Sequence, residues 1–291
     1  ALIARIAFLL EHARSDAWRL LLGDGYVYDA WARRILSGEA AREVFYQAPL
    51  YPYFLAAVYA LFGPGLAAAR AVQAVLGSVG AGLLAVAAWL WLAPSGRAAD
   101  RPASRAGSAA ATTASPPPFG RAPVLAALCA GLVLALNPSA IFFDGTIQKT
   151  SLDLFLLPAL LALLGWFSRG ASRVAAALAG VVAGLLCLTR ENAALFVPVI
   201  VLWSVWWTER LARGERAQES GPAPRPEGLR SGRPLLPAAL FLGGWLLALL
   251  PAALHNAAAG GGFVLTTSQA GSNLYIGNHA QATGTYVPLL A

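Results

Sequence analysis

Long runs of apolar residues recur along this chain, and they limit its possible folds more than any other feature. Residues 66–93 contain one charged side chain, Arg70, and similar runs lie at 123–142, 150–167, 174–189, 193–207 and 236–254. A helix of about 20 apolar residues crosses the roughly 30 Å hydrocarbon core of a bilayer. Only 12% of the residues are charged, against about 25% in soluble domains. The sequence therefore predicts an all-α polytopic membrane protein.

The first ten residues, ALIARIAFLL, are apolar but too few to span a bilayer. We interpret them as the second half of a first membrane helix, and the chain as a fragment. A cleaved signal peptide is the alternative, and it is disfavoured because no small-residue cleavage site follows. With this helix we expect about seven transmembrane helices in a domain over residues 1–254, followed by a truncated outer-face region at 255–291.

Three further segments are predicted to lie outside the bilayer. Residues 49–63, PLYPYFLAAVYALFG, are apolar but short, and we expect a helix at the membrane surface with Tyr51, Tyr53 and Tyr59 at headgroup level. Residues 94–122 are rich in Pro, Ala and Ser and should be disordered. Residues 255–291 are polar, with Gly, Asn and Thr, and we expect irregular or short β structure there.

The arginines indicate the orientation of the chain. With residues 49–63 outside the bilayer, loops 94–122, 168–173 and 208–235 fall on one face, which is cytoplasmic by the positive-inside rule. The opposite, outer face then holds the loop at 11–63, which carries five arginines of its own. The arginines of the three cytoplasmic loops are Arg97, Arg101, Arg105, Arg121, Arg169, Arg173, Arg210, Arg213, Arg216, Arg225, Arg230 and Arg233.

The same orientation gathers polar residues from distant parts of the sequence at the outer membrane–water boundary. This is the arrangement expected of a site for a substrate that is half lipid. These residues are Asp24, Gln47, Asp144, Lys149, Arg190, Glu191, His255 and Asn278.

Several classes of function have no support in the sequence. The net charge of +7 comes from 20 arginines and one lysine, most of which flank apolar segments, so we expect contacts with membrane lipids and no nucleic-acid binding. Cys129 and Cys187 lie inside apolar runs and form neither a disulfide framework nor a metal cluster. The chain has no GxSxG, Walker or CxxC motif, which leaves hydrolase, nucleotide-driven pump and redox functions unsupported.

Asp24 and Asp144 are the leading carboxylates for chemistry. A carboxylate just outside a membrane helix can accept a proton from a hydroxyl or bind a divalent metal. Asp24 is equally suited to cap a helix that begins with YVYDAWARRI. Asp144 lies in IFFDGTIQK, between two spans, and an ionisable residue at membrane depth is a functional candidate by default.

Basic residues at the same boundary are candidates for phosphate binding. Lys149 offers a point charge for a phosphate, or it extends toward the headgroups as a snorkelling side chain. Arg190 can bind phosphate oxygens in a bidentate fashion, and we do not expect it to pair with Glu191, its neighbour in sequence. His255 follows the last span and is read as a binding residue or as an interfacial one.

The order of several segments resembles one family of membrane enzymes. The sequences DGYVYDAWARRI and VFYQAPLYPYFLAAVYALFG resemble the first outer loop of the GT-C glycosyltransferases, and in particular the bacterial members of glycosyltransferase family 39. These are relatives of the protein O-mannosyltransferases and of the lipid A aminoarabinose transferase. IFFDGTIQKTSLDLFLL, GLLCLTRENAALFVP and GSNLYIGNHAQATGTYVP are similar to later segments of the same group, so the resemblance covers the whole chain.

The resemblance implies a reaction. Such enzymes take a sugar from a polyprenyl-phosphate donor at the outer face of the bacterial inner membrane and transfer it, usually with inversion, to a hydroxyl on a protein, lipid or glycan. It implies Asp24 as the catalytic base and Asp144 as a second acidic residue of the site. It implies Tyr28 as the aromatic residue of the family's Asp-x-x-x-Tyr pattern. Together with Tyr28, our candidates for substrate binding are Gln47, Tyr51, Lys149, Arg190 and His255.

Two positions depart from the pattern of the aminoarabinose transferases. Those enzymes have an acidic residue directly after the first aspartate, where this chain has Gly25, and a lysine before the Pro-Leu-Tyr element, where it has Gln47. The identity of the sugar therefore stays open. Some relatives bind a divalent metal near the first aspartate, and the sequence leaves that metal open as well.

Two other functions fit a chain of this class. A transporter or flippase for a lipid-linked substrate is the first, and it predicts paired repeats and helices broken at mid-membrane. No convincing repeat is found in the sequence. A membrane scaffold that has lost activity is the second, and it predicts binding of the donor lipid without turnover.

Overall fold

The computed structural model describes residues 1–21, 23–39, 42–93, 121–218, 234–279 and 282. All regular secondary structure in these ranges is helical. The helices follow one another as α1 (Leu2–His12), η1 (Asp16–Arg19), α2 (Asp24–Leu36), α3 (Leu50–Phe62), α4 (Leu66–Leu92), α5 (Arg121–Leu136), α6 (Pro138–Asp144), α7 (Thr150–Ser168), α8 (Arg173–Cys187), η3 (Glu191–Leu195), α9 (Phe196–Gln218), α10 (Leu235–Ala258) and α11 (Gln269–Asn278).

Four stretches of described helix are long and apolar enough to cross a membrane: α4, α7, α10 and the stretch Glu191–Arg213. A fifth is reached if α5 and α6, bent by 54° at Asn137, count as one broken span. The bend has a local cause, since Pro138 starts α6 and the Asn137 side chain accepts a hydrogen bond from the Ala140 amide. This arrangement is compatible with a polytopic membrane protein.

The prediction of about seven spans is too high for the described helices. Two of the expected spans are shorter than the roughly 20 residues that a crossing needs. The first is α1, with 11 residues, and the second is α8, with 15 residues, which ends at Cys187 and is followed by a turn into η3. The predicted run at 174–189 has almost the same bounds as α8, so the error lies in counting so short a run as a crossing.

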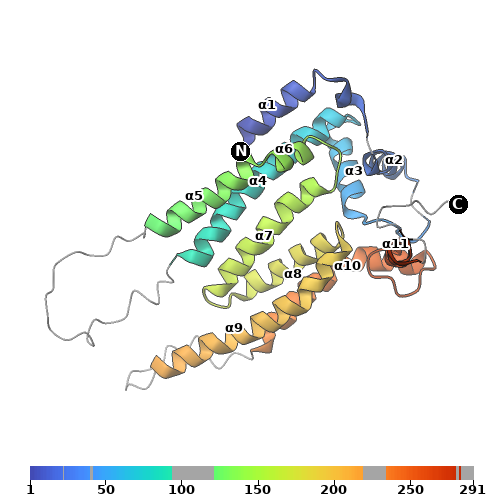
Figure 1. Cartoon of the computed structure of the whole chain (residues 1–291). Coiled ribbons are helices and arrows are strands. Elements are labelled where there is room, and N and C mark those ends of the chain that lie inside the picture. Colours follow the sequence, from blue (N-terminus) through green and yellow to red (C-terminus); the bar gives the residue numbers. More distant parts are fainter. Residues whose placement is uncertain (22, 40–41, 94–120, 219–233, 280–281, 283–291) are drawn as a thin grey trace.

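Small residues bring the central helices into close contact. A Cβ atom added at Gly180 of α8 would collide with the Phe241 carbonyl of α10, and one added at Gly244 would collide with the Ala177 carbonyl of α8. Gly80 of α4 lies equally close to the Leu154 carbonyl of α7. Glycines at membrane-helix interfaces allow such backbone contact. The packing aligns α4, α7, α8 and α10 side by side (Figure 1).

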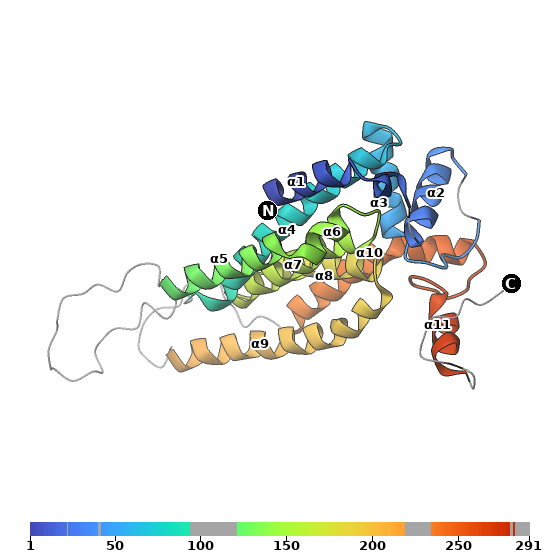
Figure 2. The same cartoon turned by 45° about the horizontal axis from the view of Figure 1, so that its top comes forward.

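The bundle has two distinct ends (Figures 1 and 2). At one end lie α2, α3 and α11, together with the start of α7 and the ends of α8 and α10. At the other end lie the last turns of α4, α7 and α9 and the turn between α7 and α8. Arg169 of that turn donates to the carbonyls of Leu90 and Ala93, which closes the C-terminal end of α4.

The arginines predicted to be cytoplasmic fall partly within the described residues. Arg121, Arg169, Arg173, Arg210 and Arg213 belong to elements whose ends lie opposite α2 (Figure 1). The remaining parts of that prediction, residues 94–120 and 219–233 with their arginines, lie outside the described residues, as does the side chain of Arg216.

Residues 49–63 form a helix as expected, but its tyrosines are not all at the surface. Tyr53 is exposed, whereas Tyr51 and Tyr59 are 0% and 2% exposed and belong to the main hydrophobic cluster. Tyr51 and Tyr59 therefore do not face lipid or water, while the depth of the three tyrosines in the membrane stays a prediction. The reason is that α3 packs against α2 and α4 instead of lying free on the bundle.

The described residues after α10 form an irregular segment, 259–268, followed by one further helix. Helix α10 continues to Ala258, and α11 covers Gln269–Asn278. The expectation of irregular or short β structure at 255–291 is wrong for residues 255–258 and 269–278, which are helical, and is confirmed for residues 259–268, which are irregular. Residues 280–281 and 283–291 lie outside the described part. Asn256 explains the compact turn between the two helices. Its buried side chain accepts from the Phe45 amide and donates to the carbonyls of Val264 and Thr266.

Candidate functional site

Asp24 is the first residue of α2, at the end of the bundle that carries α3 and α11 (Figure 1). The expectation that Asp24 caps this helix is wrong, because Gly23 takes the cap position with a φ of 53° and the helix has no side-chain cap bond. The Asp24 carboxylate is exposed and receives a long hydrogen bond, 3.5 Å, from Nε2 of Gln47. It is therefore available to a ligand, and the positive end of the helix stabilises its charge.

Gly25 explains how the start of α2 reaches the rest of the site. A Cβ atom at this position would lie 2.9 Å from the Ile147 carbonyl, which precedes α7. Any side chain here would push α2 away from the segment 145–149. The absence of an acidic residue after Asp24 is thus tied to the close packing of α2 on this segment.

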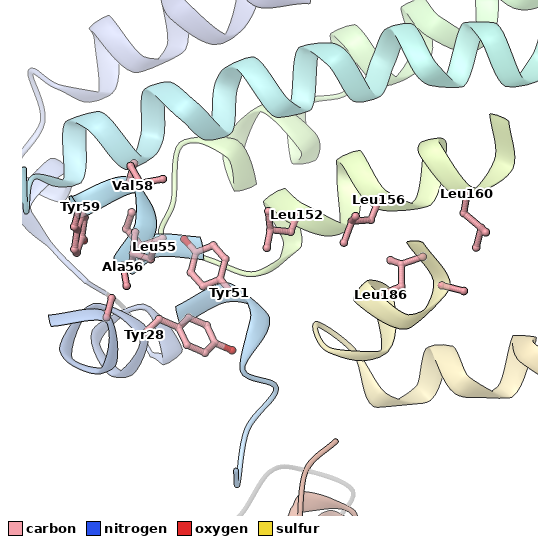
Figure 3. Packing of buried hydrophobic residues seen from close by; sticks show 14 of the residues in the cluster. Tyr28, Tyr51, Leu55, Ala56, Val58, Tyr59, Leu152, Leu156, Leu160 and Leu186 are labelled. Carbon is pink, nitrogen blue, oxygen red and sulfur yellow. The ribbon is translucent and has the colours of Figure 1, made fainter. Parts of the chain in front are cut away.

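Tyr28 lies one helical turn after Asp24 and is completely buried. Its ring packs edge-on against Tyr51 of α3, with the centroids 5.1 Å apart, and its hydroxyl points away from α2 (Figure 3). Burial, and next the charge of Asp24, raise the pKa of Tyr28 well above its usual value, while the charge of Arg190 opposes the shift. The phenol therefore stays neutral at physiological pH.

Two buried polar atoms next to Asp24 have no hydrogen-bond partner among the described residues. They are the Tyr28 hydroxyl and Oε1 of Gln47. A buried polar atom left unpaired costs about 1–3 kcal/mol, and such groups are rare in native proteins. With Nε2 of Gln47 turned to Asp24, its Oε1 can only accept. The pair therefore suits a ligand that carries hydroxyl groups.

Tyr51 contributes its ring to the site but not its hydroxyl. That hydroxyl donates to Oε1 of Gln73 at 2.6 Å, and Nε2 of Gln73 donates to the carbonyls of Asp144 and Thr146. Tyr51 thus joins α3 to α4 and to the turn before α7. Its ring therefore forms a wall of the site beside Tyr28, and its hydroxyl stabilises the framework.

Arg190 lies between α8 and η3 and turns toward the first helical turn of α7. Its Nε donates to Asp153 at 2.5 Å, and Nη2 donates to Thr150 at 3.0 Å. Its neighbour Glu191 instead accepts from Thr267, beyond α10, at 2.9 Å. The two adjacent residues face different partners, in agreement with the expectation that they do not pair. Three separate segments of the chain meet here.

Lys149 directly precedes α7, and its side chain is partly buried. Within the described ranges, no acidic group lies within 4.0 Å of it. Lys149 lies close in sequence to the residues that bind Arg190. The next residue, Thr150, accepts a hydrogen bond from Arg190. A positive charge without an ion-pair partner at this place is available to an anionic ligand.

Asp144 is placed apart from this group. Its Oδ2 accepts from Nε of Arg5 on α1 at 2.6 Å, and both side chains are 1% exposed. Gly77 of α4 makes room for the carboxylate, since a Cβ atom there would collide with it. The ion pair joins α1 to α6, and the described residues show no bond between Asp144 and Asp24 or Tyr28.

His255 lies in the last turn of α10 and supports the loop that carries Gln47. Its ring stacks on Phe45 at 4.1 Å, and Nε2 lies 3.0 Å from the Glu43 carbonyl, to which it donates when it carries the proton. Both contacts are with the framework, so the structure gives His255 a part in positioning this loop.

Asp153 and Thr267 belong to the same group and were not among the sequence candidates. Asp153 bonds to Arg190, and Thr267 bonds to Glu191. A signal for Asp153 was present, because it is the only charged residue within the apolar run at 150–167. Thr267 had no comparable signal, since a hydroxyl in a polar segment is ordinary.

The described residues contain no group of three or more His, Cys, Asp or Glu side chains that could hold a metal ion. Asp24 with Gln47 offers fewer protein ligands than a dedicated divalent site uses. Comparison of the chain with protein-family models, curated proteins and solved structures finds no match.

Proposed function

We propose that this protein is a membrane glycosyltransferase that moves a sugar from a polyprenyl-phosphate donor to a hydroxyl acceptor on a protein, lipid or glycan. The resemblance of its motifs to the GT-C enzymes of glycosyltransferase family 39 supports the proposal. In this proposal the protein lies in the bacterial inner membrane, with Asp24 on the periplasmic side.

One observation carries the proposal. The exposed carboxylate of Asp24 lies next to two buried polar atoms without partners, the Tyr28 hydroxyl and Oε1 of Gln47, at one end of an apolar helix bundle. A lipid-linked sugar needs an apolar surface for its chain and hydrogen-bonding groups for its hydroxyls, and this end of the bundle offers both. A carboxylate there is suited to accept a proton.

The reaction follows from these groups. Asp24 accepts the proton of the acceptor hydroxyl as that oxygen forms a bond to the anomeric carbon of the sugar. The bond between the anomeric carbon and the phosphate oxygen breaks, and the polyprenyl phosphate leaves with the electron pair. Arg190 and Lys149 stabilise the charge that develops on the phosphate. The donor is already activated, so no nucleotide is required.

Tyr28 and Gln47 orient the sugar in this proposal. The buried Tyr28 phenol is neutral and can donate or accept, and Oε1 of Gln47 accepts. Together they pair with sugar hydroxyls and satisfy two atoms that are otherwise unpaired. Binding energy of this kind places the anomeric carbon near Asp24 and reduces the entropy that the reaction loses.

The proposal is tested by mass spectrometry of glycans, glycolipids and glycoproteins from cells with and without the protein. We expect one hexose or pentose modification to disappear without the protein, and to return with the wild type and with Asp16→Asn. Asp16 is an exposed aspartate of the same outer loop and serves as the matched control. Asp24→Asn should not restore the modification. Identical glycans with and without the protein would contradict the proposal, and an accumulated lipid-linked sugar on one leaflet would favour a flippase.

A further inference from the structure

Asp153 has both carboxylate oxygens committed to other side chains. Oδ2 accepts from Nε of Arg190 at 2.5 Å, and Oδ1 accepts from the Thr189 hydroxyl at 2.6 Å. The Leu186 carbonyl lies 2.8 Å from the same hydroxyl, so Thr189 shares its single proton between this carbonyl and Asp153. A carboxylate held in this way is not free to act as a base. Asp153 therefore acts by holding the side chains of Arg190 and Thr189.

Arg190 is the residue that this network fixes. Nε is bound to Asp153 and Nη2 to Thr150, and both partners lie in the first turn of α7. The Arg190 side chain is nevertheless 47% exposed, and Nη1 makes no bond to any residue that the structure describes. The guanidinium is therefore held along one edge and open along another.

Arg190 lies near Tyr28, a buried residue of the site around Asp24. The charge of Arg190 acts on the buried hydroxyl of Tyr28, as do the charges of Asp24, Glu191 and Asp153. A long side chain at the surface would otherwise sample many rotamers and lose that freedom on binding a ligand. A guanidinium held by a carboxylate is already in position.

We propose that Asp153 is a positioning residue that holds Arg190, with Thr150, in the orientation that binds the phosphate of the lipid-linked donor. The inference rests on the proposed function for the identity of the ligand. Asp153 itself does not touch the donor and acts through Arg190. A positioning residue differs from a simple structural ion pair in one testable way. Removing the Asp153 carboxylate should weaken ligand binding only while Arg190 is present.

A double-mutant cycle tests the inference. The full chain in lipid nanodiscs is prepared as wild type, Asp153→Asn, Arg190→Gln and the double variant, and binding of undecaprenyl phosphate is measured for each. We expect Asp153→Asn and Arg190→Gln each to weaken binding about tenfold, and the double variant to bind as weakly as Arg190→Gln alone, because coupled residues are not additive. Thermal unfolding of each protein is measured alongside the affinity.

The matched control is Glu209→Gln, which breaks a carboxylate–arginine pair with Arg213 on α9, at the other end of the bundle. It should leave the affinity unchanged. If Asp153→Asn lowers thermal stability but not affinity, or if the two losses multiply in the double variant, the inference is overturned. A wild type that binds undecaprenyl phosphate but transfers no sugar contradicts the proposed function alone. A wild type that does not bind it overturns both.

Discussion

Arg5 on α1 and Asp144 at the end of α6 form an ion pair 2.6 Å long in which both side chains are buried. The two residues are 139 positions apart in the sequence. One further atom of each, Nη2 of Arg5 and Oδ1 of Asp144, has no partner among the described residues. The pair joins α1 to α6 and commits Asp144 to a buried ion pair, whereas the motif pattern predicts this carboxylate as a site residue.

The first prediction concerns this pair. Removing one partner leaves the other charge buried and unpaired, which costs about 3–5 kcal/mol. Arg5→Gln and Asp144→Asn should therefore both lower the thermal unfolding temperature strongly, as measured in detergent by intrinsic fluorescence. Asp153→Asn, in a partly exposed pair, should lower it less. An Asp144→Asn protein with unchanged stability but no sugar transfer would instead place Asp144 in the chemistry.

The second prediction separates activity from stability at Tyr28. Tyr28→Phe removes a buried hydroxyl that has no partner in the described structure, so it should leave stability unchanged or raise it by about 1 kcal/mol, because an unsatisfied group is lost. The same change should weaken donor binding or transfer. Stability by thermal unfolding and transfer by product formation are measured on the same preparation.

Tyr59→Phe is the control for Tyr28→Phe. The Tyr59 hydroxyl donates to Asp29 at 2.6 Å, so its loss should reduce stability and leave transfer close to the wild-type rate. A Tyr28→Phe protein that is destabilised and fully active would show that the hydroxyl has a structural partner instead of a ligand.

The third prediction tests the contact between α8 and α10. Gly244→Ala places a Cβ atom against the Ala177 carbonyl, whereas a Cβ atom at the adjacent Gly243 meets nothing within 4 Å. Overpacking of this kind costs about 1–3 kcal/mol, while Gly243→Ala should be neutral or slightly stabilising because alanine favours helix. Thermal unfolding of both variants decides the point. Equal stability of the two would mean that the helices are not in backbone contact here.

The fourth prediction concerns Asn256, which holds the chain after α10 against the loop that carries Gln47. Asn256→Ala leaves the Phe45 amide and the carbonyls of Val264 and Thr266 without their side-chain partner. Each of these groups that water does not reach should lower the free energy of unfolding by about 1–3 kcal/mol. Hydrogen exchange should then rise at Phe45 and in residues 264–268. Asn278→Ala, at an exposed position of α11, is the control and should change neither. Unchanged exchange in Asn256→Ala would contradict the anchoring role.

The apolar segments could be predicted well from the sequence because their signal is local. The predicted runs at 66–93 and 150–167 correspond closely to α4 and α7, and Pro49, Gly63 and Pro64 mark the ends of α3. The number of spans was predicted too high, because short apolar runs were counted as crossings. The run at 174–189 matches α8, Arg173–Cys187, which has only 15 residues.

The polar end of the bundle was predictable only in part. Topology alone predicted Asp24, Gln47 and Arg190 at one boundary. In the structure Gln47 bonds to Asp24 at the start of α2, and Arg190 bonds to the start of α7 at the same end of the bundle. The hydrogen-bond partners of the site residues depend on side-chain directions, which cannot be predicted from the spacing of residues along the sequence. Arg5 for Asp144, Asp153 for Arg190 and the burial of Tyr51 all follow from packing between distant segments.

The most direct test of the account is transfer of a labelled sugar from a polyprenyl-phosphate donor to a hydroxyl acceptor by the purified full chain in nanodiscs. The account predicts transfer by the wild type and by Asp16→Asn. It predicts a loss of about 100-fold or more in Asp24→Asn, the size expected for removal of a general base, with unchanged membrane insertion and thermal stability. Transfer by Asp24→Asn at the wild-type rate would contradict it.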